Sequence, residues 1–152
     1  MLAQLGETRA TSPVLARGID ALLADQEKDG SWFGRWGMNY IYGTWSALCA
    51  LAAVGEDPQA EPVRRAVAWL IRIQNPDGGW GESGRSYRLD YKEFEPSPGI
   101  ASQTAWALLG LMAAGEADHP AVARGIEYLT KHQGADGFWD QQIGKASCRE
   151  RV

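Results

Sequence analysis

The feature that most constrains this chain is a seven-residue pattern, Gln-x-x-Asp-Gly-x-Trp, that occurs three times. The copies occupy residues 26–32, 74–80 and 133–139, so the repeat tryptophans are 48 and 59 residues apart. Recurrence of one motif at such a period is typical of architectures that stack one supersecondary unit or arrange it in a ring. We therefore predict a repeat protein.

An amphipathic helix is predicted to lead into each copy of the motif. Three aliphatic residues and the repeat glutamine stand at i, i+4, i+7 and i+11, which places them on one helix face. The three sets are Leu15, Ile19, Leu22 and Gln26; Val63, Val67, Leu70 and Gln74; and Val122, Ile126, Leu129 and Gln133. Charged residues occupy the other faces, so one side of each helix should be in water. Ser12-Pro13 provides an N-cap and a first-position proline for the first helix.

Two further segments, residues 42–54 and 100–114, are predicted to be helices that are apolar almost all round, and each is followed by Gly-Glu. A helix that is apolar on every side is buried on every side. Amphipathic and apolar helices thus alternate, which predicts an all-α fold, a partial α/α barrel or toroid with the apolar helices inside. A linear solenoid is the main alternative. The connections 33–40 and 81–99 are long, as functional or disordered loops often are.

Length and charge limit the function classes. A chain of 152 residues with 45% hydrophobic and 22% charged residues is ordinary for one globular domain. A net charge of −4 and a pI near 5.2 argue against nucleic-acid binding. Residues 1–140 form the predicted domain. Residues 141–152 are interpreted as a tail, and its last stretch, 145–152, reads equally well as native sequence or as an artefact.

The motifs resemble those of the triterpene cyclases, and residues 30–45 resemble the bacterial squalene–hopene cyclases in particular. That block reads Gly-Ser-Trp-Phe-Gly-Arg-Trp-Gly-Met-Asn-Tyr-Ile-Tyr-Gly-Thr-Trp, and residues 76–82, 85–87 and 102–108 agree with the same family. The resemblance implies an enzyme that folds squalene in a dry aromatic cavity and cyclises it to a pentacyclic triterpene by protonation, without metal or cofactor. It also implies monotopic attachment to the cytoplasmic side of the inner membrane.

The departures from the family pattern concern the acid. The family has two α/α barrel domains, and this chain matches part of the second, as an internal fragment would. The proton donor of the family lies in an Asp-x-Asp-Asp motif, whereas no Asp-x-Asp occurs here. We therefore assign no catalytic residue, and we expect this segment alone to be inactive.

Cation-stabilising residues are predicted on the apolar helices. Tyr42 and Trp106 match cavity aromatics of the family, and the resemblance implies that Tyr42 stabilises an early ring cation and Trp106 a neighbouring position. Trp45 could share the face of Tyr42. Aromatic faces attract positive charge by about 0.5–2 kcal/mol each and are poor traps for it. The alternative is that all three side chains simply fill the core.

The repeat residues are predicted to be structural. The resemblance implies that Gln and Trp brace neighbouring outer helices, and the residues concerned are Gln26, Trp32, Gln74, Trp80, Gln133 and Trp139. The alternative is a tryptophan-lined surface that binds sugar. Turn formation explains the repeat aspartates better than acid catalysis does. The chain has only two His and two Cys, which makes a zinc site improbable.

The expected partners are squalene, a membrane surface and the remainder of the polypeptide, with a homodimer as an alternative. An incomplete ring should leave Tyr42, Trp45 and Leu108 on an open apolar surface. Two other functions are kept open. One is a related polyprenyl or oxidosqualene-type cyclase, and the other is a non-catalytic α/α repeat module that binds glycan or protein.

Overall fold

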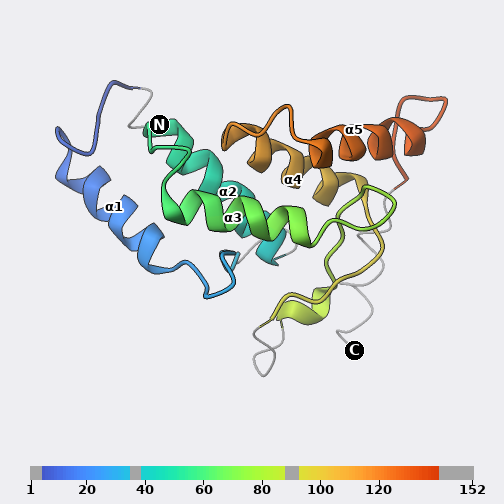
Figure 1. Cartoon of the computed structure of the whole chain (residues 1–152), viewed down its shortest axis with the longest axis horizontal. Coiled ribbons are helices and arrows are strands. Elements are labelled where there is room, and N and C mark those ends of the chain that lie inside the picture. The colour runs from blue at the N-terminus through green and yellow to red at the C-terminus, as the bar shows by residue number, and fades with distance from the viewer. Residues whose placement is uncertain (1–4, 35–38, 88–92, 141–152) are drawn as a thin grey trace.

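The computed structural model describes residues 5–34, 39–87 and 93–140, and this part of the chain is all-α, as predicted. The 141–152 tail lies outside the described residues, so its interpretation stays a prediction. Figure 1 shows the helices in chain order. They are α1 (Pro13–Ala24), α2 (Asn39–Ala53), α3 (Glu61–Arg72), the 3-10 helix η2 (Gly84–Tyr87), α4 (Ala101–Ala113) and α5 (Pro120–His132).

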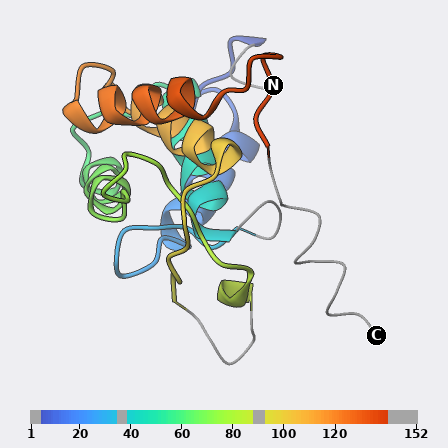
Figure 2. The ribbon, with the colours of Figure 1, turned by 90° about the vertical axis from the view of Figure 1, so that its right-hand side faces the viewer.

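The apolar helices α2 and α4 lie side by side, and the amphipathic helices cover them. Helix α3 packs on both α2 and α4, and α5 packs on α4, whereas α1 touches the other helices only sparsely. In Figure 2 α3 is seen nearly end-on beside this central pair. The pair is close where α4 carries Gly110, since a Cβ there would lie 3.2 Å from the Cα of Trp45. The predicted alternation of inner and outer helices, an arc of an α/α barrel, is confirmed.

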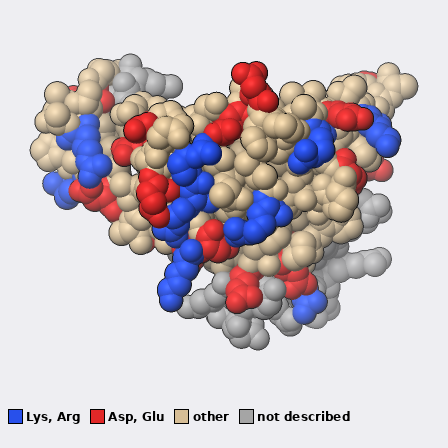
Figure 3. Space-filling view, in the orientation of Figure 1, with Lys and Arg blue, Asp and Glu red and all other residues tan. Residues whose placement is uncertain are grey.

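Charged side chains lie on the outer layer, as the sequence pattern predicts. Figure 3 shows Lys and Arg mixed with Asp and Glu over the face that α3 and α5 present. Arg64 of α3 forms an ion pair with Glu116, just after α4, and Arg65 pairs with Glu61 at 3.3 Å. Exposed pairs of this kind contribute little to stability. The outer face is therefore a solvated surface of mixed charge.

The first turn of α1 confirms a local prediction, whereas the start of α2 corrects one. Ser12 caps α1 by accepting a hydrogen bond from the Leu15 N–H at 3.4 Å, and Pro13 is the first helical residue. Helix α2 begins at Asn39, three residues before the predicted start. The extra turn forms because side chains from residues 82–87 satisfy its N–H groups, and a pattern local to residues 39–42 does not contain those partners.

All three copies of the motif fold in the same way. The repeat glutamine donates a hydrogen bond to the carbonyl of the motif's own glycine at 2.8–2.9 Å. The indole N–H donates to a carbonyl ten residues earlier, in the preceding helix, at 2.7–2.8 Å. The repeat aspartate accepts from the N–H two residues later at 3.0–3.1 Å. Each motif therefore closes the end of its own outer helix.

The first two glutamines also hold the next outer helix. The Gln26 amide donates to the Pro62 carbonyl in the first turn of α3 at 2.8 Å, and the Gln74 amide donates to the Ala121 carbonyl in the first turn of α5 at 2.9 Å. We call this bond the brace. For Gln133 the only described acceptor is the carbonyl of Gly137. The brace is thus made twice in the described part of the chain.

Glycine is required where a repeat turn presses against the next outer helix. Gly78 has a φ of +89°, and a Cβ there would lie 2.6 Å from the carbonyl oxygen of Arg124. Gly30 repeats this approach with the carbonyl of Arg65. Gly137 has a similar φ of +84°, but nothing described lies within 4 Å of its Cβ position.

One expectation about the open apolar surface is wrong. Leu108 is only 6% exposed, because Gly125 lets α5 approach so closely that a Cβ there would lie 2.8 Å from the leucine. Leu109 and Met112 are the exposed residues of α4 instead, at 49% each. Tyr42 and Trp45 are half-buried. Among the described helices, none is long and apolar enough to cross a membrane.

Gly78 lies against the next outer helix, whereas nothing described lies near Gly137, so the two positions allow a matched test of helix docking. We expect Gly78→Ala to lower the free energy of unfolding of this chain by about 3 kcal/mol, since a strained left-handed alanine adds to overpacking against a backbone carbonyl. Gly137→Ala keeps the strain without the clash and should lose about 1 kcal/mol. Urea unfolding followed by circular dichroism measures both. Equal losses would show that turn conformation alone explains these glycines.

Candidate functional site

Three aromatic rings meet on a partly covered side of the inner helices. Tyr42 and Trp45 come from α2, and Trp106 comes from α4. The Tyr42 ring lies edge-on to both indoles, with centroid distances of 5.3 Å each, and the two indoles stack at 5.9 Å with an interplanar angle of 10°. The structure therefore brings together the three residues that the sequence predicts as cation-stabilising. We call them the aromatic cluster.

The cluster differs from ordinary core filling in its burial. All three side chains are of intermediate exposure, whereas the core residues beside them, such as Leu48 and Leu111, are almost fully buried. Two buried polar atoms on the same helices lack a partner in the described part of the chain: the Trp45 indole nitrogen and the Ser102 hydroxyl. Ser102 precedes Trp106 by one turn and so lies on the same side of α4. This side of the helix pair is only partly covered.

The repeat tryptophans lie elsewhere. Trp32 and Trp80 are buried, and their backbone N–H groups donate to the hydroxyls of Thr44 in α2 and Thr104 in α4, each at 3.0 Å. Trp139 is 37% exposed. Buried indoles at the first two copies offer no face to a sugar, so a tryptophan-lined sugar surface is not built there. Trp32 and Trp80 therefore link outer helices to inner ones.

A buried carboxylate stands where the two inner helices begin, and the sequence prediction missed it. Glu82 is 1% exposed. Its carboxylate accepts hydrogen bonds from the N–H groups of Tyr40 and Ile41 at 3.1 and 3.0 Å, and from the Ser86 hydroxyl at 2.6 Å. Burial raises the pKa of Glu82 to about 7, although these three bonds oppose the rise.

Asn39 completes this polar connection. It has a φ of +44°, a left-handed conformation that Asn tolerates better than most residues. Its side-chain amide donates to the Ser86 carbonyl at 2.8 Å, and its side-chain oxygen accepts the Gly34 N–H at 3.1 Å. Its own N–H donates to the Tyr87 hydroxyl at 3.1 Å. The start of α2 is thus fixed by groups more than 40 residues away, which explains why no local pattern indicated them.

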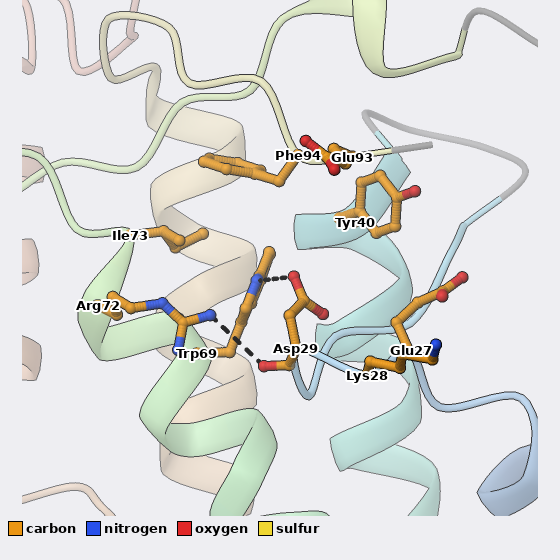
Figure 4. A pocket seen from close by; sticks show the side chains of 9 residues that line it. All are labelled: Glu27, Lys28, Asp29, Tyr40, Trp69, Arg72, Ile73, Glu93 and Phe94. Carbon is orange, nitrogen blue, oxygen red and sulfur yellow. Dashed lines mark hydrogen bonds between the residues drawn. The ribbon is translucent and has the colours of Figure 1, made fainter. Parts of the chain in front are cut away.

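A separate pocket of about 480 Å³ opens between the first repeat turn, the end of α3 and residues 93–94 (Figure 4). Asp29 lies at its centre, where one carboxylate oxygen accepts the Trp69 indole N–H at 2.8 Å and the other accepts from Ser31. Its backbone carbonyl accepts from Arg72 at 3.4 Å. Asp29 is therefore occupied by structural bonds, as the turn interpretation predicts. Among the described residues, no group of His, Cys, Asp and Glu is arranged to hold a metal ion.

The shifted Glu82 carboxyl predicts a pH dependence with a definite sign. Its pKa rises from 4.5 to about 7 on folding, so the native chain holds a proton that the unfolded chain releases between these values. The stability that Glu82 contributes should therefore fall as pH rises from 4.5 to 7, by at most about 3 kcal/mol, and stay level above. The difference in unfolding free energy between wild type and Glu82→Gln, measured in urea across this range, isolates the effect.

The other titratable groups near Glu82 do not interfere in that range. Tyr40 on α2 and Tyr87 on η2 have pKa values that burial raises, to about 12 for Tyr40, so both stay neutral. Gln103, which faces Glu82 from α4, does not titrate. A wild-type minus variant difference that rises with pH would contradict a buried carboxyl of raised pKa.

Comparison with known proteins gives matches along the whole chain. A family model described as the squalene-hopene cyclase C-terminal domain matches residues 1–149. A probable squalene–hopene cyclase of Sinorhizobium fredii is 60% identical over all of this chain, and a squalene–hopene cyclase of Bradyrhizobium diazoefficiens is 61% identical. A dammaradiene synthase of Dryopteris crassirhizoma is 42% identical over 84% of the chain. The chain spans only 24%, 23% and 20% of these three relatives.

Proposed function

This chain belongs to the family of squalene–hopene cyclase C-terminal domains, and from that premise we propose that it is a segment of an enzyme that cyclises squalene to a pentacyclic triterpene. In this proposal the aromatic cluster is part of the wall of the substrate cavity. The acid that starts the reaction comes from elsewhere in the complete polypeptide, because the chain itself contains no Asp-x-Asp.

The observation that carries the proposal is the convergence of Tyr42, Trp45 and Trp106 on one partly covered side of the inner helices. A polyene that closes rings one after another develops positive charge along a path. Several aromatic faces in a row stabilise that charge by about 0.5–2 kcal/mol each, most when water is excluded, and do not capture the cation. A carboxylate at the same place would trap it. Rings on adjacent inner helices suit such a path.

The product is a finer question, and a related cyclase is the second candidate. A relative that is 42% identical is named a dammaradiene synthase rather than a squalene–hopene cyclase. The same helices thus occur in proteins with different product names. Squalene and oxidosqualene given separately to the complete polypeptide, with products identified by mass spectrometry, distinguish the two activities.

We also propose that the complete protein attaches to one face of a membrane and pairs with itself. The support is the set of large apolar side chains that are 49–74% exposed in the described residues: Leu5, Val14, Phe33, Leu109, Met112, Ile126 and Phe138. Leu109 and Met112 stand one turn apart on α4, and exposed apolar residues that adjoin one another mark contact surfaces, whereas single ones are ordinary. Flotation with phospholipid vesicles tests attachment, and analytical ultracentrifugation in detergent tests pairing.

The role of the aromatic cluster is tested in the complete polypeptide that carries this segment. We expect Trp106→Leu to slow squalene turnover by about 10–30-fold, as the loss of one desolvated cation–π contact of up to about 2 kcal/mol implies. It should also raise the share of incompletely cyclised products, because later cations lose their stabilisation. Gas chromatography with mass spectrometry measures rate and product ratio together.

Two matched variants separate charge stabilisation from packing. Trp106→Phe keeps an aromatic face at the site and should recover most of the wild-type product ratio. Glu116→Gln removes the ion pair with Arg64 just after the same helix and should leave the ratio unchanged. A Trp106→Leu enzyme with wild-type products would rule out a cation-stabilising role for this residue.

A further inference from the structure

The Glu82 carboxylate holds the first turn of α2. Two of its three donors, the N–H groups of Tyr40 and Ile41, belong to the first turn of α2, where no helical carbonyl is available to them. Hydrogen bonds from such N–H groups to an ionised carboxylate are strong and favoured by the helix dipole. The third donor is Ser86 in η2. The side chain of Glu82 thus fixes the start of α2.

The backbone of the same residue holds α4. The Glu82 N–H donates to the side-chain oxygen of Gln103 at 2.5 Å, and the Glu82 carbonyl accepts from the Gln103 amide nitrogen at 3.3 Å. Gln103 lies in the first turn of α4 and is fully buried. One residue therefore connects the first turns of both inner helices, by its side chain to one and by its backbone to the other.

The residues that Glu82 bonds stand close along their helices to the aromatic cluster. Tyr42 directly follows Ile41, and Trp106 stands one turn after Gln103. Each ring therefore stands less than one turn of rigid helix beyond a residue that is hydrogen-bonded to Glu82. A shift of one first turn against the other changes the 5.3 Å separation of the Tyr42 and Trp106 rings.

The first repeat shows that the turn itself needs no charge. Gly34 occupies the position two residues after Trp32 that Glu82 occupies after Trp80, and its N–H is bound by the neutral side chain of Asn39. Burying a carboxylate carries a large desolvation penalty, so neutral groups would serve stability better. In the described part of the chain, the buried ionisable group stands where the two inner helices that carry the aromatic cluster begin.

We propose that Glu82 is a positioning residue, whose carboxylate sets α2 against α4 and thereby the spacing of Tyr42 and Trp106. This inference rests on the proposed function, in which those rings line the substrate cavity. Glu82 itself touches no ring of the cluster in any described contact. Its effect on the reaction is exerted through the two helices.

The test uses Glu82→Gln in the complete polypeptide at about pH 8, where the Glu82 carboxyl, whose pKa burial raises to about 7, is ionised. Glutamine has the same shape, but its amide nitrogen would face one of the backbone N–H donors, so one bond is lost and two donors oppose each other. We expect the share of incompletely cyclised squalene products to rise at least threefold. Gln74→Ala removes a brace instead, and at a similar fall in thermal midpoint it should leave the product ratio within experimental error.

A spectroscopic readout reports the geometry without any reaction. The stacked Trp45 and Trp106 indoles should contribute to the near-ultraviolet circular dichroism, and the difference between wild type and Trp45→Phe isolates their contribution. The same difference, measured in the Glu82→Gln background, should change in size or shape. In the Gln74→Ala background it should stay the same.

The outcomes separate this inference from the proposed function. If Trp106→Leu shifts the products while Glu82→Gln leaves both the product ratio and the indole difference spectrum unchanged, Glu82 is only structural and the inference is overturned. If Trp106→Leu leaves the products unchanged, the proposed function fails, and the spectrum alone decides the positioning role. An altered spectrum then supports that role, and an unaltered one overturns it.

Discussion

The brace between a repeat glutamine and the next outer helix fixes the first turns of the outer helices α3 and α5. The Gln74 amide donates to two carbonyls, that of Gly78 in its own turn and that of Ala121 in α5. The Gln26 amide likewise donates to the carbonyl of Gly30 in its own turn and to that of Pro62 in α3. One neutral hydrogen bond contributes only about 1 kcal/mol. The brace matters because both copies reach the first turn of the next outer helix. It also matters because a glycine beside each copy lets the repeat turn approach the backbone of that helix closely.

The inner helices depend on a different kind of contact. Apolar packing holds α2 against α4 along their length, but their first turns are joined by a buried polar connection in which Glu82 and Gln103 take part. Precise placement of two helices needs directional bonds, since apolar contact is non-directional. The side of these helices that packing leaves open carries the aromatic cluster. Directional bonds and an uncovered aromatic face thus occur together at the same helix ends.

Local patterns predicted much of the fold. The helices, their alternation and the capped start of α1 follow from spacing within a few turns, and the structure confirms them. The resemblance, which the family model confirms, named Tyr42, Trp45 and Trp106, and the structure places these rings together, although their role stays a prediction. Periodicity alone could not have separated them from core residues.

The parts that sequence reasoning missed depend on partners far along the chain. The start of α2 needs Glu82, which is 41 and 42 residues from the N–H groups it accepts. The burial of Leu108 needs Gly125, whose missing side chain leaves no mark in a hydrophobic pattern. In the sequence Glu82 stands out only as part of a family motif, because a single acidic residue after Trp-Gly gives no sign that it is buried.

The contacts that seat each outer helix have a consequence for how such a chain can evolve. The carbonyls of Pro62 and Ala121 receive the braces, and the carbonyls of Arg65 and Arg124 receive the close approach of the glycines. All four of these carbonyls are main-chain groups, which every amino acid possesses. Mutational drift on the receiving helix therefore leaves them in place as long as that helix still forms. Selection acts instead on the donating turn, whose few residues would be the slowest to diverge among descendants.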